Sequence, residues 1–275
     1  MPRKITDSTS KTSKLFKPFL QYLIYPSGYQ KHLMIMGCQR SGTTLISNVL
    51  DTPKYTRVYG EFSPLSDQDP AKIRLNTTEN ILCRFNSVHA PLVVTKPLVE
   101  SQNARELLSS IPNSYILWAY RNYKDVALSD IKKFRNIGGH GNILAFVNDA
   151  TSNWRNEHAS LQTIEIIKSL YSTKLKPIEA ASLFWYARNI LFFEQKLAQD
   201  KYVSLWSYDD FVKNAGSHIN NLMRWLDMPQ SNRNLSKDVF VESIGTAKSL
   251  PIDHDIDALC SNLQERLDSN KTLEC

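Results

Sequence analysis

Cysteine is scarce in this sequence, and the few that occur are not spaced for a metal or redox pair. The four cysteines, Cys38, Cys83, Cys260 and Cys275, include no C-x-x-C spacing. This pattern argues against a zinc ribbon, a redox pair or a disulfide framework, and it favours a reducing compartment. We therefore expect a cytoplasmic protein in which Cys38 is a buried or incidental thiol.

Long apolar runs are also missing. The stretch LFKPFLQYLIY at 15–25 is short and interrupted by Lys17 and Pro18, so it predicts no transmembrane segment. It lacks a signal-peptide cleavage pattern as well. The preceding residues 1–14 are rich in Ser, Thr and Lys and are expected to be disordered. We assign residues 1–30 to a tail and an edge segment, which either covers a sheet edge or touches a membrane surface.

Basic residues outnumber acidic residues by a small margin. The chain of 275 residues carries 33 Lys and Arg against 27 Asp and Glu, a net charge of +6. Such an excess suits an anionic ligand such as a nucleotide, phosphate or sulfate. Because no basic stripe with interleaved aromatic residues occurs, nucleic acid is not an expected partner. A homodimer is left open.

The order of short apolar runs and helical patterns predicts an α/β fold. A 42% hydrophobic chain of this length can form one large core, so we assign residues 31–275 to a single domain. We expect a three-layer arrangement with a central, mainly parallel sheet flanked by helices. The expected strands are Leu33–Met36, Leu92–Thr95, Tyr115–Tyr120 and Tyr202–Trp206. The expected helices are Thr43–Leu50, Ser101–Ser110, Lys124–Phe134, Ile178–Gln199 and Ser217–Leu226.

Residues 135–177 are less regular than the rest. They contain the glycine-rich stretch IGGHG at 137–141, interpreted as a turn, and a helical stretch around 158–170. We expect this region to form a cap on the acceptor side of the ligand site, although a mobile surface excursion is the alternative.

The segment GCQRSGTTL at 37–45 is the most informative motif. It follows the apolar run HLMIM and precedes a helical pattern, which is the strand–loop–helix geometry of a phosphate-binding loop. The backbone N–H groups of such a loop and the start of its helix attract an anion. The residues expected to hold a phosphate are Arg40, Ser41, Gly42, Thr43 and Thr44.

One residue of the usual nucleotide-hydrolase motif is missing from this loop. The motif G-x-x-x-x-G-K-[ST] requires a Lys after the second glycine, and Thr43 stands there instead. The strand at 115–120 ends in Tyr120 and Arg121, where an ATPase would carry an acid to hold magnesium. We therefore expect a metal-free phosphate site. A P-loop kinase-like phosphotransferase stays as an alternative.

Four further positions complete the predicted site. Lys96 ends the second expected strand and can reach a phosphate or a leaving oxygen, unless it is simply solvated. Arg121 and Ser129 can grip one phosphate from two sides. Glu61, in YGEFSPL, can act as a general base at the mouth of a cationic pocket, although a solvated loop carboxylate is the commoner case.

Together these residues resemble those of the sulfotransferases that use 3′-phosphoadenosine 5′-phosphosulfate (PAPS). GCQRSGTTL resembles the family's 5′-phosphosulfate loop, and YRNYKDVALS resembles its 3′-phosphate element. The tyrosylprotein-type and related bacterial enzymes are the most similar, since they carry an Arg in the loop. The resemblance implies that PAPS donates a sulfuryl group to a hydroxyl or amine acceptor, and that Glu61, Arg40 and Lys96 are catalytic.

The resemblance also extends beyond the loop. YVSLWSYDDF is similar to a family segment that places Tyr208 near the nucleotide, and VESIGTAKS is similar to a loop that closes over the donor. The candidates in the second segment are Ser243, Gly245 and Lys248. Because the sequence shows no membrane anchor and no luminal disulfide pattern, a Golgi protein-tyrosine role is not implied. A non-catalytic nucleotide-binding protein is the second alternative.

Overall fold

The structure of the chain is a computed structural model. It describes residues 8–27, 30–135, 138–148, 153–230, 239, 245, 247 and 250–272, with side chains from Phe16 onwards.

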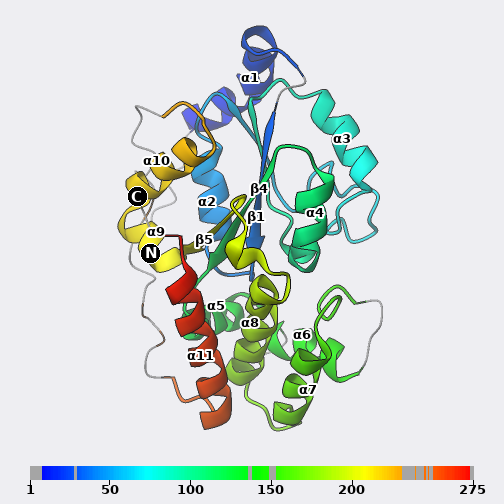
Figure 1. Cartoon of the computed structure of the whole chain (residues 1–275), viewed down its shortest axis with the longest axis vertical. Coiled ribbons are helices and arrows are strands. Elements are labelled where there is room, and N and C mark those ends of the chain that lie inside the picture. The colour runs from blue at the N-terminus through cyan, green and yellow to red at the C-terminus, as the bar shows by residue number, and fades with distance from the viewer. Residues whose placement is uncertain are drawn as a thin grey trace.

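A five-stranded, all-parallel sheet forms the centre of the molecule, in the order β2-β3-β1-β4-β5 (Figure 1). This confirms the predicted α/β fold. The strands are β1 (Lys31–Gly37), β2 (Thr56–Tyr59), β3 (Leu92–Thr95), β4 (Ser114–Tyr120) and β5 (Val203–Ser207). The sequence did not predict β2, because its four residues, TRVY, include a charge and lack a continuous apolar run.

Alternating side chains of each strand feed two separate cores. Leu33 and Ile35 of β1 pack on one face of the sheet, while Met34 and Met36 pack on the other. The first face is covered by α2 (Thr43–Leu50), α9 (Tyr208–Lys213) and α10 (Ala215–Trp225). The second is covered by α3 (Thr78–Asn86), α4 (Ala104–Ser110), α8 (Pro177–Glu194) and α11 (His254–Asn270). The result is the expected three-layer arrangement.

Helices also gather beyond the carboxyl ends of the strands (Figure 1). They are α5 (Tyr123–Phe134), α6 (Gly138–Val147) and α7 (Leu161–Leu170), together with α8 and α11. The predicted glycine-rich turn at 137–141 was wrong in part, since α6 already begins at Gly138. Gly139 is buried against α8, and a Cβ there would lie 2.6 Å from the backbone nitrogen of Ala181. The glycine therefore serves close helix packing.

Three other helices depart from the sequence-based expectation. α1 (Ser8–Ile24) begins inside the stretch that was expected to be disordered. The helix predicted to run to Gln199 ends at Glu194, because Lys196 takes a left-handed φ of 55° before a short 3-10 helix, η3 (Leu197–Gln199). The predicted helix Ser101–Ser110 is divided into the 3-10 helix η1 (Leu98–Asn103) and α4. None of the described helices is long and apolar enough to cross a membrane.

Candidate active site

The phosphate-binding loop lies between the end of β1 and the start of α2. Gly42 adopts a left-handed φ of 81° and precedes the first residue of α2, with no side chain capping that helix. The ring of Tyr208 lies against Gly42 so closely that a Cβ at this position would be 2.0 Å from Tyr208 Cδ2. Gly42 is therefore required both by the backbone and by its neighbour. Tyr208, which was predicted to lie near the nucleotide, lies beside the loop.

A buried hydroxyl in this loop lacks a partner. The side chain of Ser41 is fully buried, and among the described residues no group forms a hydrogen bond with its Oγ. Leaving such a group unsatisfied costs about 1–3 kcal/mol. Thr43 is also buried, whereas Thr44 is exposed. The Ser41 hydroxyl and the uncapped start of α2 suit a bound phosphate oxygen.

Glu61 and Lys96 form an ion pair beside the loop. Because β2 and β3 are neighbours and Tyr59 pairs with Thr95, the residues that follow these strands come together. Lys96 Nζ lies 2.9 Å from Glu61 Oε1 and donates to Thr44 Oγ1 at 2.9 Å. The side chain of Lys96 is 10% exposed and that of Glu61 is 29% exposed. One ammonium thus connects the carboxylate to the start of α2.

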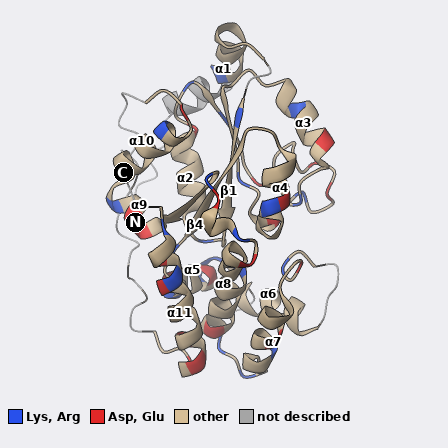
Figure 2. Cartoon of the chain, in the orientation of Figure 1, with Lys and Arg blue, Asp and Glu red and all other residues tan. Residues whose placement is uncertain are grey.

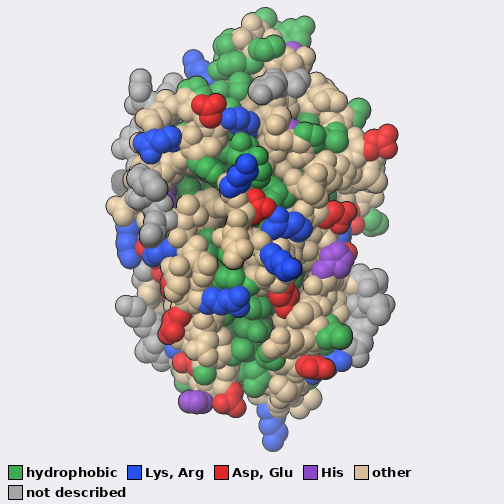
Figure 3. All heavy atoms as spheres, viewed as in Figure 1, with side chains coloured by type: hydrophobic (Ala, Val, Ile, Leu, Met, Phe, Trp, Pro, Cys, Tyr) green, Lys and Arg blue, Asp and Glu red, His purple; other side chains and the backbone are tan. Residues whose placement is uncertain are grey.

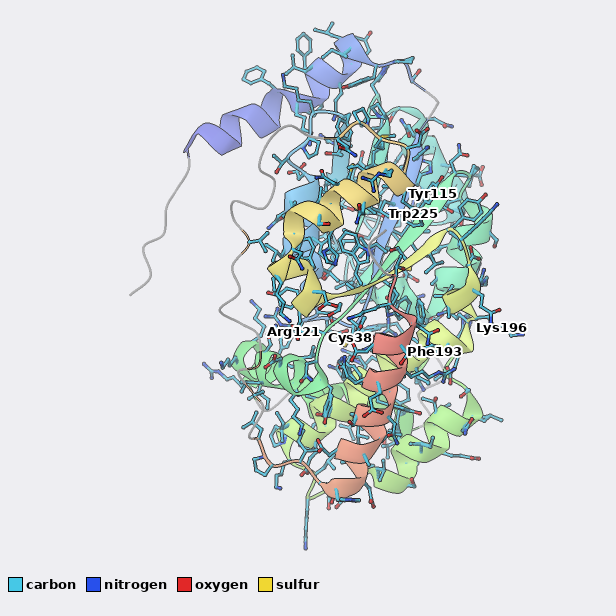
Figure 4. The ribbon with its side chains drawn as sticks, turned by 60° about the vertical axis from the view of Figure 1, so that its left-hand side comes forward. Cys38, Tyr115, Arg121, Phe193, Lys196 and Trp225 are labelled. Carbon is cyan, nitrogen blue, oxygen red and sulfur yellow. The ribbon has the colours of Figure 1, made fainter. Side chains whose placement is uncertain are left out.

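Arg121 and Ser129 approach the loop from the opposite side. Arg121 follows β4, and its guanidinium lies 4.7 Å from the centroid of the Tyr208 ring. Ser129, on α5, accepts a hydrogen bond of 3.1 Å from Nε of Arg40. In this structure Ser129 therefore contacts the loop arginine, and Tyr208 connects Arg121 to Gly42. Figure 4 marks Arg121 and Cys38, which follow the adjacent strands β4 and β1.

Asp125 is a buried residue of this region that the sequence analysis missed. Its Oδ2 lies 3.8 Å from Nη2 of Arg121 and accepts a hydrogen bond from the backbone N–H of Gly245 at 2.8 Å. Its Oδ1 accepts one from Ala247 at 3.0 Å. Gly245 thus lies beside Arg121. The other two candidates of that segment, Ser243 and Lys248, lie outside the described residues.

The signal for Asp125 was its position in the first turn of a predicted helix, only four residues after Arg121.

Two buried acidic groups near the loop have raised pKa values. Burial raises the pKa of the Cys38 thiol to about 12, so the thiol stays protonated at neutral pH, as expected of an incidental cysteine. Burial also raises the pKa of Asp130, against the opposing effect of the positive charge of Arg40. Among the described residues, Oδ2 of Asp130 has no hydrogen-bond partner.

Charges of both signs gather where the strands end (Figure 2). The loop and Arg40, Lys96 and Arg121 provide N–H donors for anionic groups, and Glu61 provides a proton acceptor. The described part of the chain holds no group of three or more His, Cys, Asp or Glu side chains suited to a metal ion. This arrangement fits a bisphosphorylated ligand with a reactive group held near Glu61.

Comparisons with known proteins agree on one family. The model of the family described as "Sulfotransferase domain" matches residues 30–251. No curated protein sequence matches.

Solved structures show the same fold at low sequence identity. The sulfotransferase domain from the curacin biosynthetic pathway is 13% identical with a TM-score of 0.53, over 86% of this chain and 98% of that one. The sulfotransferase from Alicyclobacillus acidocaldarius is 14% identical with a TM-score of 0.50, over 89% and 97%. The domain from the Synechococcus PCC 7002 olefin synthase is 11% identical with a TM-score of 0.51, over 89% and 97%.

Proposed function

Because this chain belongs to the sulfotransferase family, we propose that it transfers a sulfuryl group from PAPS to a hydroxyl or amine acceptor. The observation that supports the choice of donor is the placement of one cationic side chain on each side of the loop, Lys96 beside Thr44 and Arg121 beside Tyr208. Two such groups suit a nucleotide with phosphates at two positions.

In this proposal the loop holds the 5′ end of the donor. The backbone N–H groups of residues 41–44 and the hydroxyls of Ser41, Thr43 and Thr44 bind the 5′-phosphate. The unpartnered, buried hydroxyl of Ser41 supports this assignment, because a phosphate oxygen would satisfy it. Tyr208, packed on Gly42, shapes the adjacent wall of the site.

The 3′-phosphate is assigned to Arg121 and Ser129. The guanidinium offers a fork of N–H donors, which a phosphate accepts in a bidentate manner. Ser129, now bonded to Arg40, has a hydroxyl that can also donate to a phosphate oxygen. Asp125 accepts from Gly245 and Ala247, and Ser243 and Lys248, their neighbours in sequence, are also proposed to bind the donor.

PAPS supplies a sulfuryl group whose leaving partner is a phosphate oxygen. We propose that Glu61 takes the proton of the acceptor as a new bond forms from the acceptor oxygen or nitrogen to sulfur. The bond from sulfur to the 5′-phosphate oxygen breaks at the same time. Arg40 and Lys96 stabilise the negative charge that develops on the bridging and leaving oxygens. Lys96 also holds the Glu61 carboxylate in place, since their ion pair is 2.9 Å long.

The test is transfer of radioactive sulfur. Purified protein with ³⁵S-labelled PAPS and pooled metabolite and polymer fractions should yield a labelled acceptor product without added divalent metal. Binding of the donor without transfer to any fraction would favour a non-catalytic nucleotide-binding protein. Magnesium-dependent ATP turnover would favour a phosphotransferase, although the absent loop lysine and the basic end of β4 speak against that alternative.

The acceptor side is assigned to residues 135–177. α6 and α7 in this region pack against α8, and Asp130, which adjoins Arg40, lies against Gly138 at the start of α6.

We also propose a cytoplasmic location, which the free thiols of Cys38, Cys83 and Cys260 support. The proposal also includes no metal, no nucleic-acid partner and no transmembrane segment. A homodimer is left to sedimentation analysis.

A further inference from the structure

Helix α1 turns an apolar face away from the protein. The described residues include eleven exposed large hydrophobic side chains, and six of them belong to residues 16–24 of this helix. Their exposed fractions are 42% to 64%. They are Phe16, Phe19, Leu20, Tyr22, Leu23 and Ile24. Figure 3 shows hydrophobic side chains covering the end of the molecule where α1 lies, and Figure 4 shows side chains projecting outward from it.

Two polar side chains in the described part of α1, Lys17 and Gln21, face inward, which is the reverse of an ordinary surface helix. Gln21 is buried, and its Nε2 donates to the carbonyl oxygens of Lys54 at 2.8 Å and Thr56 at 2.7 Å. Lys17 Nζ donates to the carbonyl oxygen of Asp51 at 2.6 Å and forms an ion pair with its carboxylate at 3.1 Å. These contacts fix the rotation of α1, so its apolar face stays outward.

The sequence around this face is strongly basic. Residues 1–27 contain a single acid, Asp7, against five basic residues, and a cleft on the flank of α1 adds the guanidinium of Arg57. The basic residues of the segment are Arg3, Lys4, Lys11, Lys14 and Lys17, of which Lys17 is already paired with Asp51. Two copies of such a segment would repel one another, whereas an anionic lipid surface would attract it.

We propose that α1 docks this protein on an anionic membrane surface, lying in the plane of the interface with its aromatic and aliphatic side chains among the lipids. An interfacial helix is recognised by such a one-sided apolar face combined with Lys and Arg. The partner of this face is a lipid surface, because aromatic and aliphatic groups insert at the headgroup boundary while the basic charges bind the headgroups. The inference is independent of the proposed catalytic roles.

The experiment is flotation of the full chain with lipid vesicles. Vesicles of phosphatidylcholine with about 30 mol% phosphatidylserine should carry the protein upward, and vesicles of phosphatidylcholine alone should carry much less. About 0.5 M salt should release most of the bound protein, because screening removes the headgroup attraction. Lys11→Gln with Lys14→Gln should weaken binding by about fivefold per lysine.

The decisive variant is Phe19→Glu with Leu23→Glu. Both side chains are exposed, so the fold should persist, as circular dichroism would check, while binding should fall at least about tenfold. The matched control is Leu161→Glu on α7, another highly exposed apolar position, which should float like the original protein.

Two results would overturn the proposal. One is failure of the original chain to float with either vesicle. The other is a dimer, measured by sedimentation, that the double variant dissociates while no vesicle binds.

Discussion

At the scale of single residues, Lys96 connects the two chemical roles in the site. Its ammonium contacts both Glu61 Oε1 and Thr44 Oγ1 at 2.9 Å, so one cation spans the proposed base and the proposed phosphate loop. Glu61 follows β2 and Lys96 follows β3, and these two strands pair, with Tyr59 opposite Thr95. The placement of Glu61 therefore follows from the pairing of β2 with β3 rather than from its own loop.

Replacing Glu61 with Gln keeps the shape of the side chain but removes the proton acceptor. We expect kcat for sulfuryl transfer to fall by about 10²–10⁴-fold, with affinity for 3′-phosphoadenosine 5′-phosphate (PAP) unchanged. The measurements are steady-state transfer and calorimetric titration. Glu79→Gln, an exposed position on α3, is the control and should behave like the original chain. Near-normal turnover of Glu61→Gln would remove this residue from the base role.

Asp130 gives a prediction about pH. Burial raises its pKa in the folded state, so the folded chain holds a proton that the unfolded chain, with a pKa near 3.9, has lost. The native state is therefore penalised progressively as pH rises from about 4 through the raised pKa. Asp130→Asn, which is neutral throughout, lacks this penalty.

The free energy of unfolding of Asp130→Asn minus that of the original chain should accordingly increase with pH across this window, as measured by denaturant titration. A difference that is flat would mean that the charge of Arg40 cancels the effect of burial, and one that decreases with pH would mean that it outweighs burial.

The residues of the loop could be predicted because one short stretch of sequence is enough to identify them. Arg40, Ser41, Gly42, Thr43 and Thr44 are consecutive, and the strand before them and the helix after them can be read from the same stretch of sequence. Asp125 and Asp130 were not predictable in this way. Their importance depends on contacts with Gly245 and on proximity to Arg40, which only the folded chain creates.

At the scale of elements, the loop and α9 are coupled through Gly42. Gly42→Ala would place a methyl group in a left-handed backbone conformation and into the ring of Tyr208, the first residue of α9. We expect affinity for PAP to fall at least about tenfold because the loop must shift. Gly141→Ala is the matched control, since a Cβ there meets nothing within 4 Å and adds helix propensity to α6. Unchanged affinity in Gly42→Ala would contradict the loop geometry.

A second coupling joins α5 to the segment after α10. Asp125→Asn retains one acceptor oxygen but loses the charge that accepts from Gly245 and Ala247. Amide hydrogen exchange at these two residues should accelerate, and affinity for PAP should fall severalfold, because charge-assisted hydrogen bonds are about twice as strong as neutral ones. Asp227→Asn, at an almost fully exposed site, serves as the comparison. Equal hydrogen-exchange rates at Gly245 and Ala247 in the two variants would contradict this coupling.

Some helices and strands were easier to predict from the sequence than others. β1, β3, β4 and α2 have continuous apolar runs or clear helical spacing, and each was predicted within a few residues. β2 and α3 were missed because their burial depends on neighbours distant in sequence. α1 was missed because its polar side is the buried one, which reverses the pattern that identifies a surface helix.

At the scale of the whole molecule, the central claim is that two cationic groups at neighbouring strand ends bind one bisphosphorylated adenosine. β1 and β4 pair directly, with Gly37 opposite Ala119, so the loop and Arg121 necessarily face the same edge of the sheet. Membership of the sulfotransferase family and this shared edge both support the proposed donor. The proposed acceptor side lies in residues 135–177, whose contacts the sequence pattern did not define.

The most direct measurement is calorimetric titration of the purified chain with PAP in the absence of divalent metal. We predict saturable binding of one molecule per chain, weakened by about 10- to 100-fold in Arg121→Ala and unchanged in Arg224→Ala, an exposed arginine on α10. No binding by the original chain, or equal affinity in Arg121→Ala and Arg224→Ala, would contradict the account.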